Sequence, residues 1–137
     1  MDSNSNSDIS VVMLHDSHLY LAPRFIRKFQ PSSIITQFIH IPWPDVRWWH
    51  FLPSNIEYDI YSSLVSGNDI IGFQTTLDAR NFIEGVRLLL KDTVINFEEG
   101  VISWQDHHTH IRVYPISIST IDERRVVQSA AGKRAAV

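Results

Sequence analysis

Short apolar runs and segments of helical periodicity alternate along most of this chain. Three runs rich in β-branched residues are typical of strands buried in a parallel sheet, at residues 9–14, 33–41 and 69–73. Apolar residues recur at helical spacing in three longer segments, at residues 19–29, 54–65 and 77–91. Asp45 can cap one more short helix over residues 46–52. This alternation predicts an α/β fold.

The pattern changes in the last third of the chain. Residues 94–97 and 101–104 are typical of an antiparallel ribbon, and residues 111–118 of a further buried strand. Together with the preceding elements, this order predicts a Rossmann-like, doubly wound α/β domain with a mainly parallel sheet.

The length allows one domain with a substantial core, because the chain has 137 residues, of which 44% are hydrophobic and 20% charged. We expect this domain to span residues 9–120. The Ser- and Asn-rich residues 1–8 are expected to form a disordered tail, and residues 121–137 a charged, Ala-rich tail.

Charge and composition exclude several classes of partner. The net charge is −3 and no basic stripe is interleaved with aromatic residues, so we expect no nucleic-acid partner. No apolar run approaches the roughly 20 residues that cross a bilayer, and the first residues do not resemble a signal peptide. Cysteine is absent, which rules out disulfides. A cytoplasmic protein is the expectation.

Polar residues follow each of the first three predicted strands. His15 and Asp16 come after the first, His40 closes the second, and Gln74 and Thr75 follow the third. Ligands of open α/β sheets bind outside the carboxyl ends of the strands. The sequence therefore predicts a ligand site where these residues meet.

Four segments in this order carry a family resemblance: residues 15–19, 40–44, 72–75 and 114–116. They resemble the HDYHL, HxPFP, GFQT and YPIGI stretches of trehalose-6-phosphate synthases. Ser17, Trp43 and Ser117 stand where the family usually has Tyr, Phe and Gly, which leaves the identity of the acceptor open.

The resemblance implies two Rossmann-like domains that face a cleft (the GT-B arrangement) and need no metal or other cofactor. The amino-terminal domain of such an enzyme mostly holds the acceptor sugar phosphate, and the carboxyl-terminal domain holds UDP-glucose. Glucose is then transferred from UDP-glucose to glucose 6-phosphate with retention of configuration, which gives trehalose 6-phosphate. Two such domains need roughly 400 residues or more. We therefore expect this chain to be a piece of the acceptor-side domain, without the donor domain.

Two residues match functional positions of the family. Asp16 matches the aspartate that binds the acceptor, and a carboxylate can accept charge-assisted hydrogen bonds from sugar hydroxyls. It could instead cap the helix that follows. His40 matches the histidine near the reacting anomeric carbon, and it could instead be a core histidine beside Trp43. Asp16 is thus the predicted substrate-binding residue and His40 the predicted catalytic one.

Neighbouring polar residues have simpler interpretations. His15 and His18 are expected to orient their loop rather than to touch substrate. Gln74 and Thr75 can line the cleft, although Thr75 as a helix cap is an equally good explanation.

Two further clusters suggest chemistry less strongly. His108 and His110 would share one face of a strand, and imidazoles suit zinc, but the segment lies away from the predicted ligand end, so no metal site is expected. Aromatic residues gather after the second strand, where core packing is a commoner role than sugar stacking; they are Trp43, Trp48, Trp49 and Phe51.

Three functions remain open on the sequence. The first is a trehalose-6-phosphate synthase, in the whole protein. The second is a related transferase with another acceptor, such as a glucosylglycerol-phosphate synthase. The third is a truncated, non-catalytic binding module.

Overall fold

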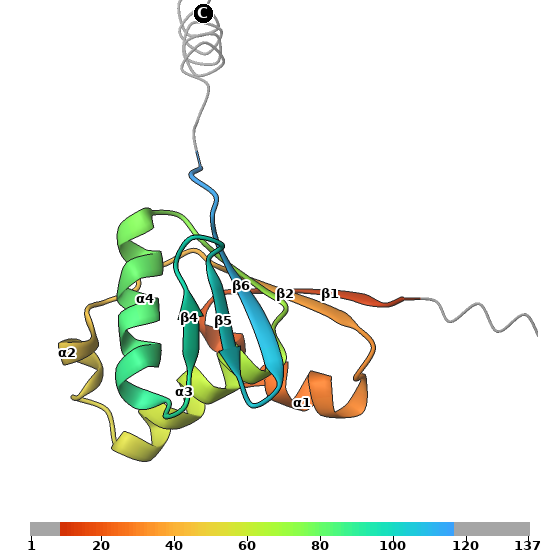
Figure 1. Ribbon diagram of the computed structural model, residues 1–137, viewed down its shortest axis with the longest axis horizontal. Helices are drawn as coiled ribbons and strands as arrows, with labels where there is room; N and C mark the ends of the chain where they lie inside the picture. Colours follow the sequence, from red (N-terminus) through yellow and green to blue (C-terminus); the bar gives the residue numbers. More distant parts are fainter. Residues whose placement is uncertain (1–8, 117–137) are drawn as a thin grey trace, which may run out of the picture.

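The computed structural model describes residues 9–116. Its strands are β1 (Val11–His15), β2 (Ile34–Ile39), β3 (Ile70–Phe73), β4 (Val94–Asn96), β5 (Val101–Trp104) and β6 (His107–Val113). Its helices are the short 3₁₀ helix η1 (Ser17–Leu19) and the α-helices α1 (Ala22–Phe29), α2 (Val46–Trp49), α3 (Ser54–Gly67) and α4 (Thr76–Leu89). Figure 1 shows their arrangement.

All six strands form one mixed sheet in the order β1-β2-β3-β6-β5-β4. The first four strands of this order are parallel, and β5 and β4 add an antiparallel ribbon at the β6 edge. The predicted α/β class, the mainly parallel sheet and the ribbon are therefore confirmed.

The winding of the chain puts the helices of residues 9–116 on one face of the sheet. Each crossover from β1 to β2, β3 and β6 moves in the same direction, and right-handed crossovers in one direction place their helices on the same side. The burial of β2 agrees with this arrangement. Ile35 and Ile39, which face the helices, are buried, whereas Ile34, which faces the other side of the sheet, is 41% exposed. The described residues thus contain one of the two helical layers that the predicted doubly wound arrangement requires.

The opposite surface, which we call the open face, is apolar and accessible. Val11 and Met13 of β1 are 59% and 70% exposed there, although parallel strands are normally covered on both faces. Phe38 and Gly72 continue this surface across β2 and β3 toward the carboxyl ends of the strands.

The core between sheet and helices is built around Trp43, which is 1% exposed. Its indole N–H donates to the Tyr61 hydroxyl over 2.9 Å, and its backbone N–H donates to the Asp78 carboxylate over 2.9 Å. Trp49 stacks on it and is also buried, whereas Trp48 and Phe51 are 65% and 81% exposed. The core interpretation therefore holds for Trp43 and Trp49 only.

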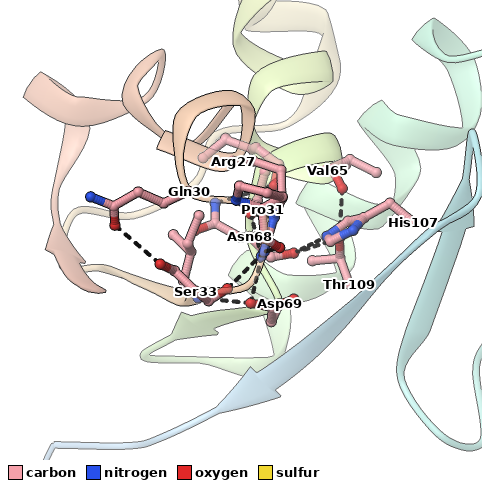
Figure 2. A network of polar contacts seen from close by, with 12 residues as sticks. Arg27, Gln30, Pro31, Ser33, Val65, Asn68, Asp69, His107 and Thr109 are labelled. Carbon is pink, nitrogen blue, oxygen red and sulfur yellow. Dashed lines mark hydrogen bonds and ion pairs between the residues drawn. The ribbon is translucent and has the colours of Figure 1, made fainter. Parts of the chain in front are cut away.

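The amino ends of β2, β3 and β6 are tied together by a polar network (Figure 2). Arg27 of α1 donates to the Asp69 carboxylate over 2.6 Å and also to the Gly67, Pro31 and Ser33 carbonyls. The same carboxylate accepts the Ile35 backbone N–H over 2.7 Å.

A second part of the network reaches β6 through Asn68. The buried Thr109 hydroxyl donates to the Val65 and Asn68 carbonyls, and His107 Nε2 donates to the Asn68 carbonyl over 2.8 Å. Because these bonds join three strands to two helices, they hold the amino ends of the strands in register.

Two sequence expectations need correction. The predicted helix 19–29 is a 3₁₀ turn followed by α1, and its apolar stripe does not face the core: Phe25 and Phe29 are 52% and 77% exposed. Instead α1 packs on α3 through Pro23, whose atoms would lie within 2.6 Å of any Cβ at Gly67.

The last strand begins earlier than the predicted residue 111. Gln105 and Asp106 both have positive φ, at 48° and 62°, which is the backbone of a two-residue hairpin turn. This turn pairs His107 with Trp104, so β6 starts at His107.

The predicted tails, residues 1–8 and 121–137, lie outside the described residues, as do residues 117–120 of the predicted domain. In the part of the chain that is described, no helix has the length and apolar character needed to span a bilayer.

Candidate functional site

The carboxyl ends of β1, β2 and β3 bring three predicted polar segments together. The parallel register pairs His15 with Phe38 and Ile39 with Phe73, so the residues that follow these strands leave the sheet at one edge. Asp16, His40 and Gln74 meet there, as the sequence predicts.

Asp16 is bonded to the β2 loop and does not cap a helix. Its Oδ1 accepts the His40 backbone N–H over 3.0 Å, and its own N–H donates to the Phe38 carbonyl over 3.0 Å. The Gln37 side-chain amide, which is buried, donates to the Asp16 carbonyl over 3.1 Å. Asp16 precedes η1 but makes no side-chain bond to that turn, so the capping alternative is wrong.

The backbone of Asp16 is strained. Its φ is 61° and its ψ is −176°, a region that is essentially reserved for glycine. Residues held this way cost about 1–3 kcal/mol and cluster at functional sites. The three hydrogen bonds around Asp16 are what hold the carboxylate at this edge.

His40 is exposed and held by groups from three strands. Gln74 donates its side-chain amide to the His40 carbonyl over 2.8 Å, and the Phe38 ring meets the imidazole edge-on at 4.6 Å between centroids. His40 Nε2 lies 2.9 Å from Nδ1 of His15, and the two rings meet edge to edge with their centroids 5.2 Å apart. His40 is therefore not a buried core histidine.

A hollow of about 430 Å³ lies on the open face beside these histidines. Gly72 forms part of its floor, and a Cβ at this position would lie 2.7 Å from the Phe38 ring and 3.0 Å from the Tyr114 ring. The hollow is mainly apolar, and the imidazoles of His15 and His40 line it at the carboxyl edge.

The charge of Asp16 acts on one buried neighbour. Burial, and to a smaller degree the Asp16 carboxylate, raise the pKa of the Tyr20 hydroxyl far above its ordinary value of about 10. The buried Tyr20 hydroxyl beside Asp16 therefore stays protonated and neutral at physiological pH.

Comparison with known proteins agrees with these motifs. The profile of the family described as Glycosyltransferase family 20 matches residues 3–135. The chain belongs to glycosyltransferase family 20.

Relatives of this family 20 chain include enzymes whose names contain phosphorylated compounds. A validamine 7-phosphate valienyltransferase of Streptomyces hygroscopicus subsp. jinggangensis is 34% identical over 126 residues, which cover 90% of this chain and 25% of that protein. A bifunctional trehalose-6-phosphate synthase/phosphatase of Thermoproteus tenax is 33% identical over 108 residues, which cover 79% of this chain and 14% of that protein.

A solved structure from E. coli with UDP-2-fluoro glucose bound has the same fold, with a TM-score of 0.73 and 25% identity over 84% of this chain and 24% of its own. The family 20 chain thus spans about a quarter of the length of several of the proteins that it matches.

Two of the other predicted residues, Thr75 and Gln74, make structural hydrogen bonds in this family 20 chain. Thr75 is the N-cap of α4, where its hydroxyl accepts the Asp78 N–H over 3.1 Å. His18 is exposed on η1. Gln74 holds the His40 loop by donating to the His40 carbonyl. Its position in the GFQT motif is the sequence signal that pointed to this residue.

The histidines of β6 lie at the opposite end of the sheet. His107 donates to Asn68, His108 Nδ1 lies 2.7 Å from the Ser103 hydroxyl, and His110 Nδ1 accepts from the Arg112 guanidinium over 3.1 Å. Among residues 9–116 no three His, Cys, Asp or Glu side chains are grouped as metal ligands.

Sequence reasoning missed Phe38, Gln37 and the contact of His15 with His40. Alternation along β2 does place Phe38 on the open face and Gln37 on the helical face, but it gives no hint that Gln37 supports Asp16.

Proposed function

We propose that residues 9–120 form part of the acceptor-side domain of a glycosyltransferase that moves glucose from UDP-glucose to glucose 6-phosphate. The observation that carries this proposal is the strained Asp16, whose carboxylate is bonded to the backbone of His40 at the carboxyl edge of the sheet. Family 20 membership supports the reaction class, and the names of relatives support the substrates.

Asp16 has one carboxylate oxygen to offer a ligand. Within the described residues Oδ1 is used by the His40 N–H, and Oδ2 has no protein hydrogen bond. A carboxylate oxygen in this position can accept from an acceptor hydroxyl and orient the attacking oxygen.

His40 has one ring nitrogen to offer a ligand. Its Nε2 faces His15, and in the described part of the chain Nδ1 has no protein partner. In the reaction, the bond between the anomeric carbon and the UDP oxygen breaks while the acceptor oxygen bonds to the same carbon, and the hydroxyl proton leaves with UDP. His40 Nδ1 can hydrogen-bond a donor-sugar hydroxyl beside that carbon.

A related acceptor is the second candidate. The relative that is 34% identical is a validamine 7-phosphate valienyltransferase, so another phosphorylated ring compound fits the same family and the same edge. Asp16 would then bind a hydroxyl of that compound in the same way.

The test is a segment exchange. In the UDP-forming trehalose-phosphate synthase of Pichia angusta, which is 32% identical over 116 residues, the matching segment is replaced by residues 9–116 of this chain, giving what we call the exchange enzyme. We expect it to form trehalose 6-phosphate from UDP-glucose and glucose 6-phosphate. UDP-glucose binding measured by calorimetry checks that it is folded.

A folded exchange enzyme that binds UDP-glucose but transfers to no phosphorylated acceptor would contradict the proposal. Transfer to validamine 7-phosphate or glycerol 3-phosphate alone would select the second candidate. The 137-residue chain by itself is expected to transfer no glucose, because it spans only about a quarter of the length of the valienyltransferase that is 34% identical to it. Trehalose 6-phosphate formation by that chain would contradict this expectation.

A further inference from the structure

The two imidazoles at the carboxyl edge form a direct hydrogen bond. His15 Nδ1 and His40 Nε2 are 2.9 Å apart, and the rings are nearly parallel, with 27° between their planes. Each residue comes from a different strand, and the Asp16 carboxylate joins the same two loops through the His40 N–H.

This geometry couples the protonation of the two rings. A neutral imidazole has one N–H and one lone pair, so one ring must donate and the other accept. If His15 donates from Nδ1, His40 accepts at Nε2 and both rings carry their proton on Nδ1. If His40 donates from Nε2, both rings carry their proton on Nε2. The two neutral rings therefore always have the same tautomer.

We propose that His15 is a positioning residue that holds the ring of His40 and couples the tautomer of His40 to its own. Through this bond the tautomer of His15 determines whether Nδ1 of His40 is a donor or an acceptor, as partners of one imidazole nitrogen do for the other. The role in catalysis rests on the proposed function, whereas the coupling itself does not.

Aromatic contacts alone cannot supply this role. Phe38 also contacts the His40 ring, but an aromatic edge leaves the position of the imidazole proton unconstrained. His15 is the group within the described residues that bonds a ring nitrogen of His40. A phenylalanine in place of His15 keeps an aromatic ring beside His40 and loses the hydrogen bond, which separates the two contributions.

The first test is ¹⁵N NMR of the histidine rings in the 137-residue chain, about two pH units above the ordinary histidine pKa of about 6.5. We expect a coupling between His15 Nδ1 and His40 Nε2 across the hydrogen bond, and equal tautomer populations in the two rings. Absence of the coupling, or unequal populations, overturns the proposal. The exchange enzyme is not involved, so this result is independent of the proposed function.

The second test compares His15→Phe with His15→Asn in the exchange enzyme. Asn places an amide near the position of Nδ1, so it can bond His40 Nε2, whereas Phe cannot. We expect kcat to fall about tenfold in His15→Phe, as for loss of other groups that orient a functional histidine, with the KM for the acceptor nearly unchanged. His15→Asn should recover most of kcat.

Equal kcat values for the Phe and Asn variants would show that the pair positions nothing, even where the NMR coupling is present. If the exchange enzyme is inactive, the proposed function fails, and the NMR result still decides the coupling of His15 and His40.

Discussion

Both ends of the parallel strands carry polar clusters, but the clusters are built differently. At the amino end, Arg27 and Asp69 satisfy each other and several backbone groups, and their side chains are only 20% and 33% exposed. At the carboxyl end, Asp16 sits in a strained backbone, and His15 and His40 are exposed, with hydrogen-bonding atoms still open among the described residues.

This difference separates stabilising polar groups from functional ones. Polar groups that bond one another and the backbone, as Arg27 and Asp69 do, have little left to offer a ligand, and their removal costs stability. A cluster that holds a strained backbone and unbonded polar atoms lowers the stability of the folded protein. Mutations at the amino end should therefore change unfolding, and mutations at the carboxyl end should change binding and catalysis.

The largest expected effect is on stability at the amino end. Asp69→Ala removes the carboxylate that accepts from Arg27 and from the Ile35 N–H. We expect the free energy of unfolding of the chain to fall by about 2–3 kcal/mol, since hydrogen bonds to charged groups are worth about that much. Urea denaturation followed by circular dichroism measures it.

Asp59→Ala is the matched control, because Asp59 of α3 makes a single 3.0 Å ion pair with Arg24, which lies in α1 like Arg27, and both side chains are about a third or more exposed. It should cost less than about 1 kcal/mol. Similar losses in the two variants would contradict the distinction between the network and an ordinary surface ion pair.

The second effect is on the reaction at the carboxyl end. Asp16→Asn keeps an oxygen that can accept the His40 N–H and removes the charge that binds an acceptor hydroxyl. In the exchange enzyme we expect kcat/KM for glucose 6-phosphate to fall about 10- to 100-fold, which corresponds to about 1–3 kcal/mol. Thermal stability should change little.

Asp45→Asn is the control for the charge change, because Asp45 lies in the next loop and pairs with exposed Arg47. It should leave kcat/KM within about twofold, as expected of surface substitutions. Loss of stability with intact acceptor kinetics in Asp16→Asn would show that Asp16 is only structural.

The sequence predicted the strands and the meeting of Asp16 with His40. The β-branched runs indicate where the strands lie, and the polar residues that follow them indicate where the carboxyl ends of the strands meet. It did not predict the orientation of α1. An amphipathic stripe says that a helix has an apolar side, and Phe25 and Phe29 show that this side can be left facing outward while Arg27 faces the fold.

The bond between His15 and His40 was also beyond sequence reasoning. Asp16, whose carboxylate bonds the His40 N–H, has a positive φ, and a non-glycine residue at such an angle leaves no periodicity to recognise. The resemblance named Asp16 and His40 as functional positions, but only the geometry shows what holds them.

The third effect tests the strain itself. Asp16→Ala and Asp16→Gly both lose the bond to His40, but only glycine adopts φ near 60° and ψ near 180° without strain. We expect the glycine variant to be more stable than the alanine variant by about 1 kcal/mol, after allowance for the greater flexibility of unfolded glycine. Paired denaturation curves measure the difference, and an alanine variant that is equally or more stable would mean that the site stores no strain.

The smallest expected effect is that of metal removal at the amino end. His107 and His110 each use a ring nitrogen in a hydrogen bond to the protein, and His108 is paired with Ser103. A structural zinc would contribute folding energy outright, so its removal would lower the melting temperature strongly. Because these histidines stabilise the strand through protein partners, dialysis against a chelator should leave the melting temperature of the chain unchanged within about 1 °C, and zinc added back should not raise it. A large fall that zinc reverses would instead move the amino end into the class of functional clusters, and the contrast between the two ends of the sheet would not hold.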